Sequence, residues 1–141
     1  MPKRFKKDIP SKINPNIQGV TFQPQGISFS FKYFQENHDK FSVQRKDYKY
    51  WLSLLDRLKA LSTLSAEEIL LNHSKTLRCH SISWNETTET KFGIPNESRL
   101  VDVPYQFSLS SNEHGRVHGF FIDKVFYIVW LDPEHLLYAS K

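Results

Sequence analysis

The residues best suited to chemistry lie in the stretch from Gly115 to Tyr138. Arg116 and His118 come near its start, and His135 and Tyr138 come near its end. Histidine, with an ordinary pKa of about 6.5, suits proton transfer near neutral pH, and tyrosine, at about 10, suits hydrogen bonding or acid work. Metal-independent RNA cleavage needs a base for the 2′-hydroxyl, an acid for the leaving 5′-oxygen and a cation beside the phosphorane. These four side chains can supply all three.

The same residues also have a purely structural interpretation. His135 and Tyr138 can close the last turn over the core, because histidine and aromatic side chains are often half-buried for packing. Arg116 and His118 alternate along an expected strand, so they share one of its faces in either case.

A metal site is the third interpretation. His114 and His118 form a His-x3-His pair, and His135, Cys79 and His80 are further candidate ligands. Such a pair converges on one side of a helix, whereas a glycine turn and a strand are expected here. We therefore predict neither a metal nor a cofactor.

The elements that must position these residues form the end of the expected sheet. Residues 125–131 read VFYIVWL, seven apolar residues in succession, which is typical of a strand covered on both faces. Residues 116–122 form the preceding strand, and the Asp-Lys pair between them fits a tight antiparallel hairpin. An Asp-Pro pair ends the second strand. We predict that the sheet core includes Phe107, Leu109, Val117, Phe126, Ile128 and Trp130.

The first half of the chain predicts one strand and two helices. Residues 27–34 alternate apolar and polar side chains, as a half-buried strand does. Asp47 is an expected N-cap, and the sequence SAEE at residues 65–68 matches a capping box for a shorter helix that runs to about Asn72. The apolar face of the first helix is expected to comprise Tyr48, Trp51, Leu54, Leu55, Leu58 and Leu61.

The second half predicts more strands. Residues 77–84 and 105–110 alternate as strands do, and the polar, turn-rich segment 85–104 is expected to cover a site. The order of elements predicts an α+β domain in which two helices in the N-terminal half pack on a mainly antiparallel sheet of four to five strands. The sheet face away from the helices is expected to remain open to a nucleic acid.

Composition and charge favour a single, mildly basic domain. The 141 residues carry a net charge of +4 with a pI of about 9.2, which tilts the chain toward phosphate-rich partners. The single cysteine excludes an internal disulfide, and no signal peptide or membrane span is recognisable, so we expect a cytoplasmic protein. Residues 1–25 are interpreted as a basic extended arm that reaches phosphate or is simply solvated, and residues 26–141 as the α+β domain.

The segments YQFSLSS, GRVHGFFI and KVFYIVWL, followed by HLLY, carry a resemblance to a known family. In their succession the chain resembles the RelE/ParE superfamily of small basic toxins. The resemblance implies a strand, a helix pair and an antiparallel sheet, and an activity that cleaves messenger RNA, often on the ribosome. It also implies that Arg116 binds phosphate and that His135 and Tyr138 lie near the C-terminal catalytic positions.

We therefore predict a toxin-like endoribonuclease, an mRNA interferase of a toxin-antitoxin system, that acts without a metal. The expected partners are RNA, free or on the ribosome, and a cognate antitoxin protein, with no membrane. The alternative is a non-catalytic basic module of phage or mobile-element origin that binds nucleic acid or protein. The predicted catalytic residues are Arg116, His118, His135 and Tyr138, and the predicted RNA-binding residues are Arg78, His80, Lys3, Arg4, Lys6 and Lys7.

Overall fold

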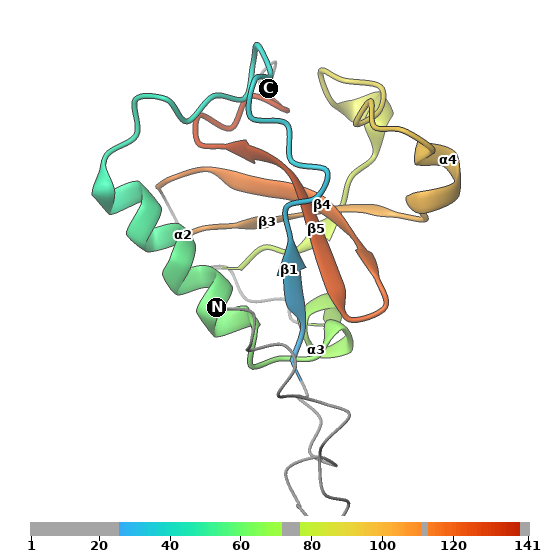
Figure 1. Cartoon of the computed structure of the whole chain (residues 1–141), viewed down its shortest axis with the longest axis horizontal. Helices are drawn as coiled ribbons and strands as arrows, with labels where there is room; N and C mark the ends of the chain where they lie inside the picture. The colour runs from blue at the N-terminus through green and yellow to red at the C-terminus, as the bar shows by residue number, and fades with distance from the viewer. Residues whose placement is uncertain (1–25, 72–76, 111–112, 139–141) are drawn as a thin grey trace, which may run out of the picture.

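Five strands form one mixed sheet in the order β1-β5-β4-β3-β2 (Figure 1). A computed structural model describes residues 26–71, 77–110 and 113–138. The predicted basic arm lies outside the described residues. The strands are β1 (Ser28–Ser30), β2 (His80–Ser81), β3 (Pro104–Ser108), β4 (Arg116–Ile122) and β5 (Val125–Asp132). The helices are α2 (Tyr48–Leu61), α3 (Ala66–Leu71), the 3-10 turn η3 (Trp84–Glu86) and α4 (Glu97–Leu100).

The predicted hairpin is confirmed and occupies the middle of the sheet. β4 and β5 pair antiparallel from Arg116 opposite Asp132 to Ile122 opposite Val125. β3 and β2 continue the antiparallel pairing on one side, whereas β1 pairs parallel to β5 on the other. The predicted α+β class with a mainly antiparallel sheet is thus confirmed.

A β-bulge in β5 decides which face each residue of this strand occupies. His118 pairs with Trp130 and Gly119 pairs with Ile128, so Val129 is the extra residue. Side chains alternate between the two faces of a strand, and one extra residue inverts the alternation beyond it. Trp130 and Asp132 therefore share the face of Arg116 and His118.

Helix α2 begins where the sequence predicts, but its buried stripe differs from the predicted one. Asp47 Oδ1 accepts hydrogen bonds from the backbone N–H of Lys49 and Tyr50, at 3.1 and 3.3 Å. The buried residues of α2 are Tyr50, Leu54, Leu58 and Leu61. The predicted inclusion of Tyr48, Trp51 and Leu55 is wrong, because they lie on a second apolar stripe that faces outward and are 71%, 38% and 61% exposed.

Helix α3 starts with the predicted capping box. The Ser65 N–H donates to Glu68 Oε1 at 2.8 Å, and the Glu68 N–H donates to Ser65 Oγ at 3.1 Å.

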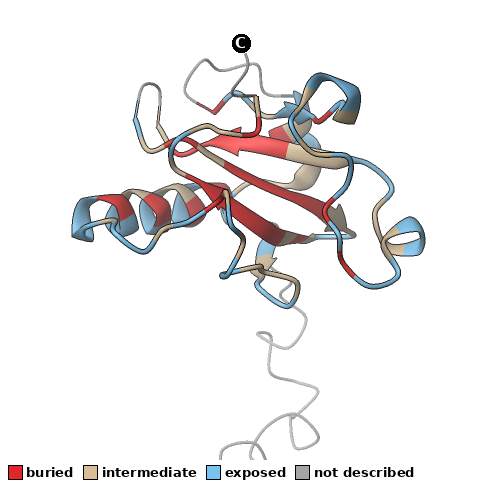
Figure 2. Cartoon of the chain, turned by 90° about the horizontal axis from the view of Figure 1, so that it is seen from above, coloured by how far each residue is buried: buried red, intermediate tan, exposed pale blue. Residues whose placement is uncertain are grey.

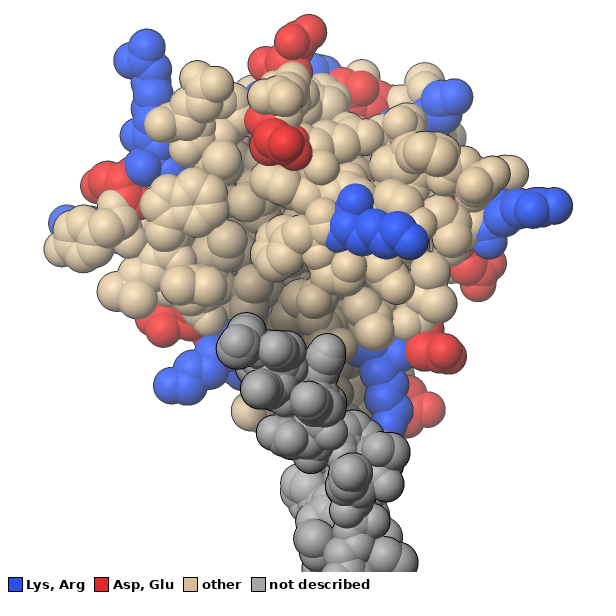
Figure 3. Space-filling model, in the orientation of Figure 1, with Lys and Arg blue, Asp and Glu red and all other residues tan. Residues whose placement is uncertain are grey.

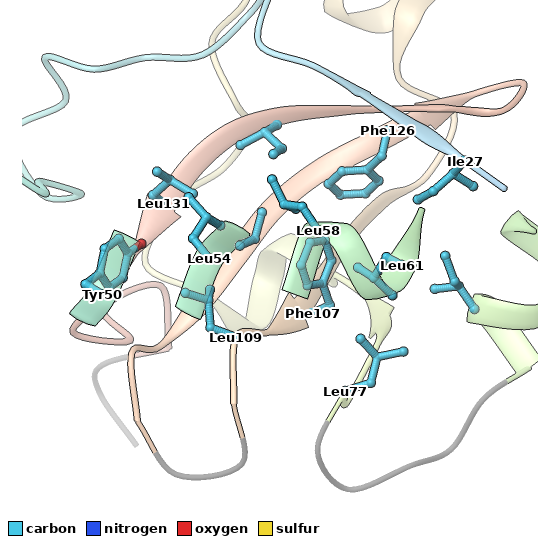
Figure 4. Packing of buried hydrophobic residues seen from close by; sticks show 13 residues of the cluster. Ile27, Tyr50, Leu54, Leu58, Leu61, Leu77, Phe107, Leu109, Phe126 and Leu131 are labelled. Carbon is cyan, nitrogen blue, oxygen red and sulfur yellow. The ribbon is translucent and has the colours of Figure 1, made fainter. Parts of the chain in front are cut away.

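Helix α2 packs against one face of the sheet and forms the first core. Figure 4 shows Leu54, Leu58 and Leu61 pointing toward side chains of the strands. The strand residues that complete this cluster include Phe107, Leu109, Val117, Phe126, Ile128 and Leu131.

The other face of the sheet is not open as predicted, because loops cover it with a second core. Trp130 and Phe120 pack there against Phe41 from one loop and Phe92 from another. The strands are accordingly buried along most of their length (Figure 2). The apolar residues in the connecting segments supply this cover.

The segment 85–104 has its own local structure. The Glu97 side chain accepts hydrogen bonds from the backbone N–H of Phe92, Gly93 and Ile94, at 2.8, 2.8 and 3.3 Å. This carboxylate fixes the loop so that Phe92 and Ile94 are buried in the second core. No helix within the described residues is long and apolar enough to cross a membrane.

Replacing Trp130 by alanine should lower the free energy of unfolding by ~3–5 kcal/mol, as the loss of a large buried aromatic does. Trp130 is 1% exposed and contacts the rings of Phe41, Trp84 and Phe92. Urea denaturation followed by circular dichroism measures the change, with Trp51→Ala on the outer stripe of α2 as the control. A Trp130→Ala variant as stable as the wild type would contradict the central position of β5.

Candidate functional site

Four of the predicted site residues line one hollow at the edge of the sheet. We call it the C-terminal hollow; its volume is about 600 Å³. Strands β2, β3 and β4 supply part of its wall, and the turn after β5 supplies the rest. The lining residues are His80, Gln106, Arg116, Glu134, His135, Leu136 and Tyr138. The structure thus brings Arg116, His135 and Tyr138 together with His80, across 58 residues of sequence.

A second hollow of about 350 Å³ adjoins the first and brings in Arg78. We call it the arginine hollow. It shares Arg116, Glu134 and His135 with the C-terminal hollow. Its lining residues are Arg78, His114, Gly115, Arg116, Pro133, Glu134 and His135. Two arginines beside a histidine make it suited to an anionic group such as a phosphate.

His118, predicted as catalytic, lines neither hollow. Its side chain is fully buried, and its Nε2 lies 3.0 Å from Asp132 Oδ2, which is fully buried as well. His118 therefore contacts the second core and Asp132 rather than any ligand in these hollows.

Asp132 in turn fixes the segment that carries the site. Its Oδ1 accepts the N–H of Leu136 at 2.7 Å, and its Oδ2 accepts the N–H of Leu137 at 3.0 Å. Its carbonyl accepts the N–H of His135 at 3.1 Å. His135 itself has a φ of 57°, a left-handed conformation that a non-glycine residue seldom adopts unless its surroundings hold it there. The Asp132 hydrogen bonds supply that constraint and set the position of the imidazole.

Gly115 lets strand β4 begin directly against this turn. Its φ is +68°, and a Cβ atom at this position would lie 2.0 Å from the carbonyl oxygen of Asp132. Only glycine fits such a contact with the backbone. The glycine before Arg116 therefore brings the arginine and the turn after β5 to the same edge.

The protonation states of the buried pair follow from its surroundings. Burial lowers the pKa of His118, and its hydrogen bond to Asp132 only partly offsets this effect. Burial acts to raise the pKa of Asp132, but the hydrogen bonds from His118 and from the backbone N–H groups of Leu136 and Leu137 outweigh it, and the pKa is lowered. Near neutral pH a neutral His118 thus donates its Nε2–H to an ionised Asp132.

The environment of the hollow separates the pKa values of His135 and Tyr138. Burial, followed by the charge of Arg116, lowers the pKa of His135, so its imidazole is neutral at neutral pH. Burial, followed by the charge of Glu86, raises the pKa of Tyr138, so its hydroxyl keeps its proton. The arrangement offers a proton acceptor and a proton donor in one hollow, which is the pattern of acid–base sites. Burial, followed by the charge of Arg78, lowers the pKa of Arg116.

Three residues of this site were missed by sequence reasoning. Gln106 and Glu134 line the C-terminal hollow, and Asp132 holds the turn. Gln106 alternates with apolar residues in its strand, as an exposed polar side chain would, so the sequence carries no signal of its burial, and the Asp-Pro pair predicts only a strand end. The predicted Lys3, Arg4, Lys6 and Lys7 lie outside the described residues. Among the residues that the structure does describe, no three His, Cys, Asp or Glu side chains are grouped to hold a metal ion.

We predict that the free energy of unfolding falls as the pH is lowered from 7 to 5, in part because of His118. Below its ordinary pKa of about 6.5 an unfolded histidine binds a proton, whereas folded His118 stays neutral until a lower pH. The unfolded state then binds more protons, so acid destabilises the fold until the pH passes the folded pKa. Asp132 acts in the same direction, below its ordinary value of 3.8.

The measurement is urea denaturation at several pH values. His118→Gln keeps a donor for Asp132 but does not titrate. The free energy of unfolding of this variant should therefore change less steeply with pH than that of the wild type. His80→Gln replaces an exposed histidine of β2 and serves as the control. Equal slopes in the wild type and the His118→Gln variant would refute the buried neutral histidine.

Comparisons of the chain with protein-family models, with curated proteins and with solved structures gave no match. The chemistry of the two hollows is therefore the basis for inferring a function.

Proposed function

We propose that the protein is a metal-independent endoribonuclease of the toxin type and that the C-terminal hollow is its active site. The observation that carries the proposal is the placement of Arg116, His135 and Tyr138 around one hollow, with the pKa values of the last two shifted in opposite directions. RNA cleavage by attack of the 2′-hydroxyl needs this set of groups and no metal.

His135 is the general base of the proposed reaction. Its neutral imidazole accepts the proton of a ribose 2′-hydroxyl, whose oxygen then bonds to the adjacent phosphorus. The lowered pKa keeps the imidazole available for this role at neutral pH.

Tyr138 is the general acid. The backbone N–H of Ser83 hydrogen-bonds to its hydroxyl oxygen and acts to lower its pKa, but burial and the charge of Glu86 outweigh this, and the raised pKa keeps the hydroxyl proton in place. That proton passes to the 5′-oxygen as the bond between phosphorus and this oxygen breaks. The products are a 2′,3′-cyclic phosphate and a free 5′-hydroxyl.

Arg116 stabilises the negative charge of the phosphorane, with Arg78 beside it. Arg116 lies at the junction of the two hollows, and the charge of Arg78 acts on it. Around the face seen in Figure 3, by contrast, lysine and arginine side chains are interspersed with acidic ones. The electrostatic attraction for RNA is therefore proposed to concentrate at the hollows and at the N-terminal arm.

The fold agrees with this proposal at a coarse level. An α+β domain whose last two strands form a hairpin is compatible with the arrangement that the resemblance to RelE/ParE toxins implies. A cognate antitoxin and action on the ribosome are further parts of the proposal.

The alternative function, a module that binds a protein or nucleic acid without chemistry, has one observation in its favour. The outward stripe of α2 comprises residues spaced three or four apart, which lie on one side of a helix, and all four are exposed: Tyr48, Trp51, Leu52 and Leu55. Such a stripe suits a protein partner, which in the first proposal is the antitoxin. If induction of the gene in a bacterium is toxic and a neighbouring gene relieves the toxicity, the enzyme is favoured. If the gene can be expressed without its neighbour and without toxicity, the binding module is favoured.

Replacing His135 by alanine should lower the rate of RNA cleavage by ~100-fold or more, because positioned acid–base groups contribute ~10²- to 10⁴-fold. Arg116→Ala should act similarly by removing charge stabilisation, and Tyr138→Phe by removing the acid. The measurement is cleavage of messenger RNA by purified protein, with and without ribosomes.

The controls distinguish a failure of the proposed activity from a failure of the assignment of its residues. Arg99→Ala removes an exposed arginine of α4 that lines neither hollow and should cleave as the wild type does. Circular dichroism checks that each variant folds. An inert wild type, both with and without ribosomes, would refute the enzyme; a wild type that cleaves no faster than the three site variants would refute only the assignment of residues.

Deleting residues 1–12 should weaken RNA binding without unfolding the domain. The segment contains Lys3, Arg4, Lys6, Lys7 and Lys12, and phosphate contacts of this kind release counterions. The deletion should therefore also reduce the dependence of the dissociation constant on salt, measured by fluorescence anisotropy with a labelled RNA. An affinity that responds neither to salt nor to the deletion would contradict the proposed arm.

A further inference from the structure

Buried polar atoms without partners gather on strands β3 and β4 beside the C-terminal hollow. Within the described residues, five buried side-chain polar atoms make no hydrogen bond, and four of them belong to these two strands. The four are Gln106 Oε1, Ser108 Oγ, Arg116 Nε and His118 Nδ1; the fifth is Tyr50 Oη. Because a buried polar group without a partner is costly, such a group beside a hollow indicates where a ligand supplies the missing hydrogen bond.

Gln106 is the member of this set that lines the hollow and is itself almost wholly buried. It is 2% exposed. In the sheet it pairs with His80 on β2 and with His118 on β4. Its side chain therefore lies between His80, which also lines the hollow, and the buried His118, and its oxygen has no protein partner in the described part of the chain.

The neighbouring His80 fixes which way the Gln106 amide points. His80 Nδ1 lies 2.9 Å from the carbonyl oxygen of Ser81, so this nitrogen must carry the proton and donate it. His80 Nε2 is then an acceptor, and the Gln106 atom 3.0 Å away must be the donating Nε2. The remaining atom, Gln106 Oε1, is a hydrogen-bond acceptor whose orientation is set by the protein.

The rest of the C-terminal hollow suits a flat ring. His80, His135 and Tyr138 contribute rings to its wall, and Leu136 contributes apolar surface. Aromatic and imidazole rings bind unstacked bases by stacking. Arg116 stands where this hollow meets the arginine hollow, which is suited to the phosphate of the same nucleotide.

We infer that the C-terminal hollow binds one unpaired nucleobase and that Gln106 Oε1 accepts a hydrogen bond from its edge. This inference deepens the proposed function and rests on it for the place of the phosphate. A phosphate group cannot replace the base at Gln106, because a phosphate oxygen and the amide oxygen are both acceptors.

The hydrogen bond gives the site a means of selecting among bases. A ligand that places a donor against Gln106 Oε1 satisfies it, whereas a ligand that places a ring acceptor or a methyl group there leaves the buried oxygen unpaired. Sites built to hydrogen-bond a donor reject analogues that lack it far better than apolar pockets reject isosteres. Gln106 is thus a specificity residue, not a catalytic one.

The experiment measures binding of the four ribonucleoside 3′-monophosphates and of ribose phosphate without a base to the full chain, by calorimetry. We expect one base to bind at least about tenfold tighter than the others, and all of them to bind tighter than ribose phosphate. Gln106→Met, of similar shape but without the amide, should remove the preference among bases. A methyl group on the donor nitrogen of the preferred base should weaken its binding to the wild type by a similar factor.

Ser108→Ala is the matched control. Ser108 is buried on the same face of β3 and also lacks a partner in the described residues, but it does not line the hollow, so the preference should persist. Equal binding of all four nucleotides, binding no tighter than that of ribose phosphate, or a preference that survives Gln106→Met would overturn the inference.

Cleavage assays separate this result from the proposed function. A base preference that depends on Gln106 in a protein that cleaves no RNA supports the base site and refutes the enzyme. Cleavage that depends on His135, without any base preference that depends on Gln106, supports the enzyme and refutes the base site.

Discussion

The buried hydrogen bond between His118 and Asp132 joins the middle of the sheet to the turn that carries the site. One carboxylate accepts the imidazole N–H and two backbone N–H groups of that turn, so the side chains that follow β5 are held by the core itself. A buried carboxylate is stable only when its oxygens are satisfied in this way. The position of His135 and Tyr138 therefore depends on a histidine that lies outside both hollows.

The β-bulge in β5 is the condition for that hydrogen bond. Without the extra residue Val129, strict alternation would place Asp132 and Trp130 with Phe126 and Ile128, on the face covered by α2. The carboxylate would then point away from His118. All the residues predicted for the core are buried, yet the sequence VFYIVWL does not reveal that they divide between two faces, because a bulge leaves no mark in an uninterrupted apolar run.

Features that depend on neighbouring residues were predictable, and those that depend on distant ones were not. The caps of α2 and α3 follow from side chains two or three residues from the backbone groups they bind. The buried face of α2 does not, because the helix has two apolar stripes and only the sheet decides which one is covered. The type of residue pointed to Arg116, His135 and Tyr138, whereas Gln106 and Asp132 acquire their meaning only from the strands beside them.

The two arginines of the hollows act on the imidazole in the same direction. Arg116 and Arg78 both lower the pKa of His135, and Arg78 lowers that of Arg116, whereas the charge of Asp132 acts in the opposite direction on both groups. The two arginines thus place like charges beside a partly buried imidazole. Like charges at short range destabilise a fold, and such an arrangement is typical of sites where a ligand brings the opposite charge. An RNA phosphate between the two arginines would relieve their repulsion and raise the proton affinity of His135. In the proposed reaction, binding and proton transfer would thus be coupled, since the phosphate that aligns the 2′-hydroxyl would also strengthen the base that deprotonates it.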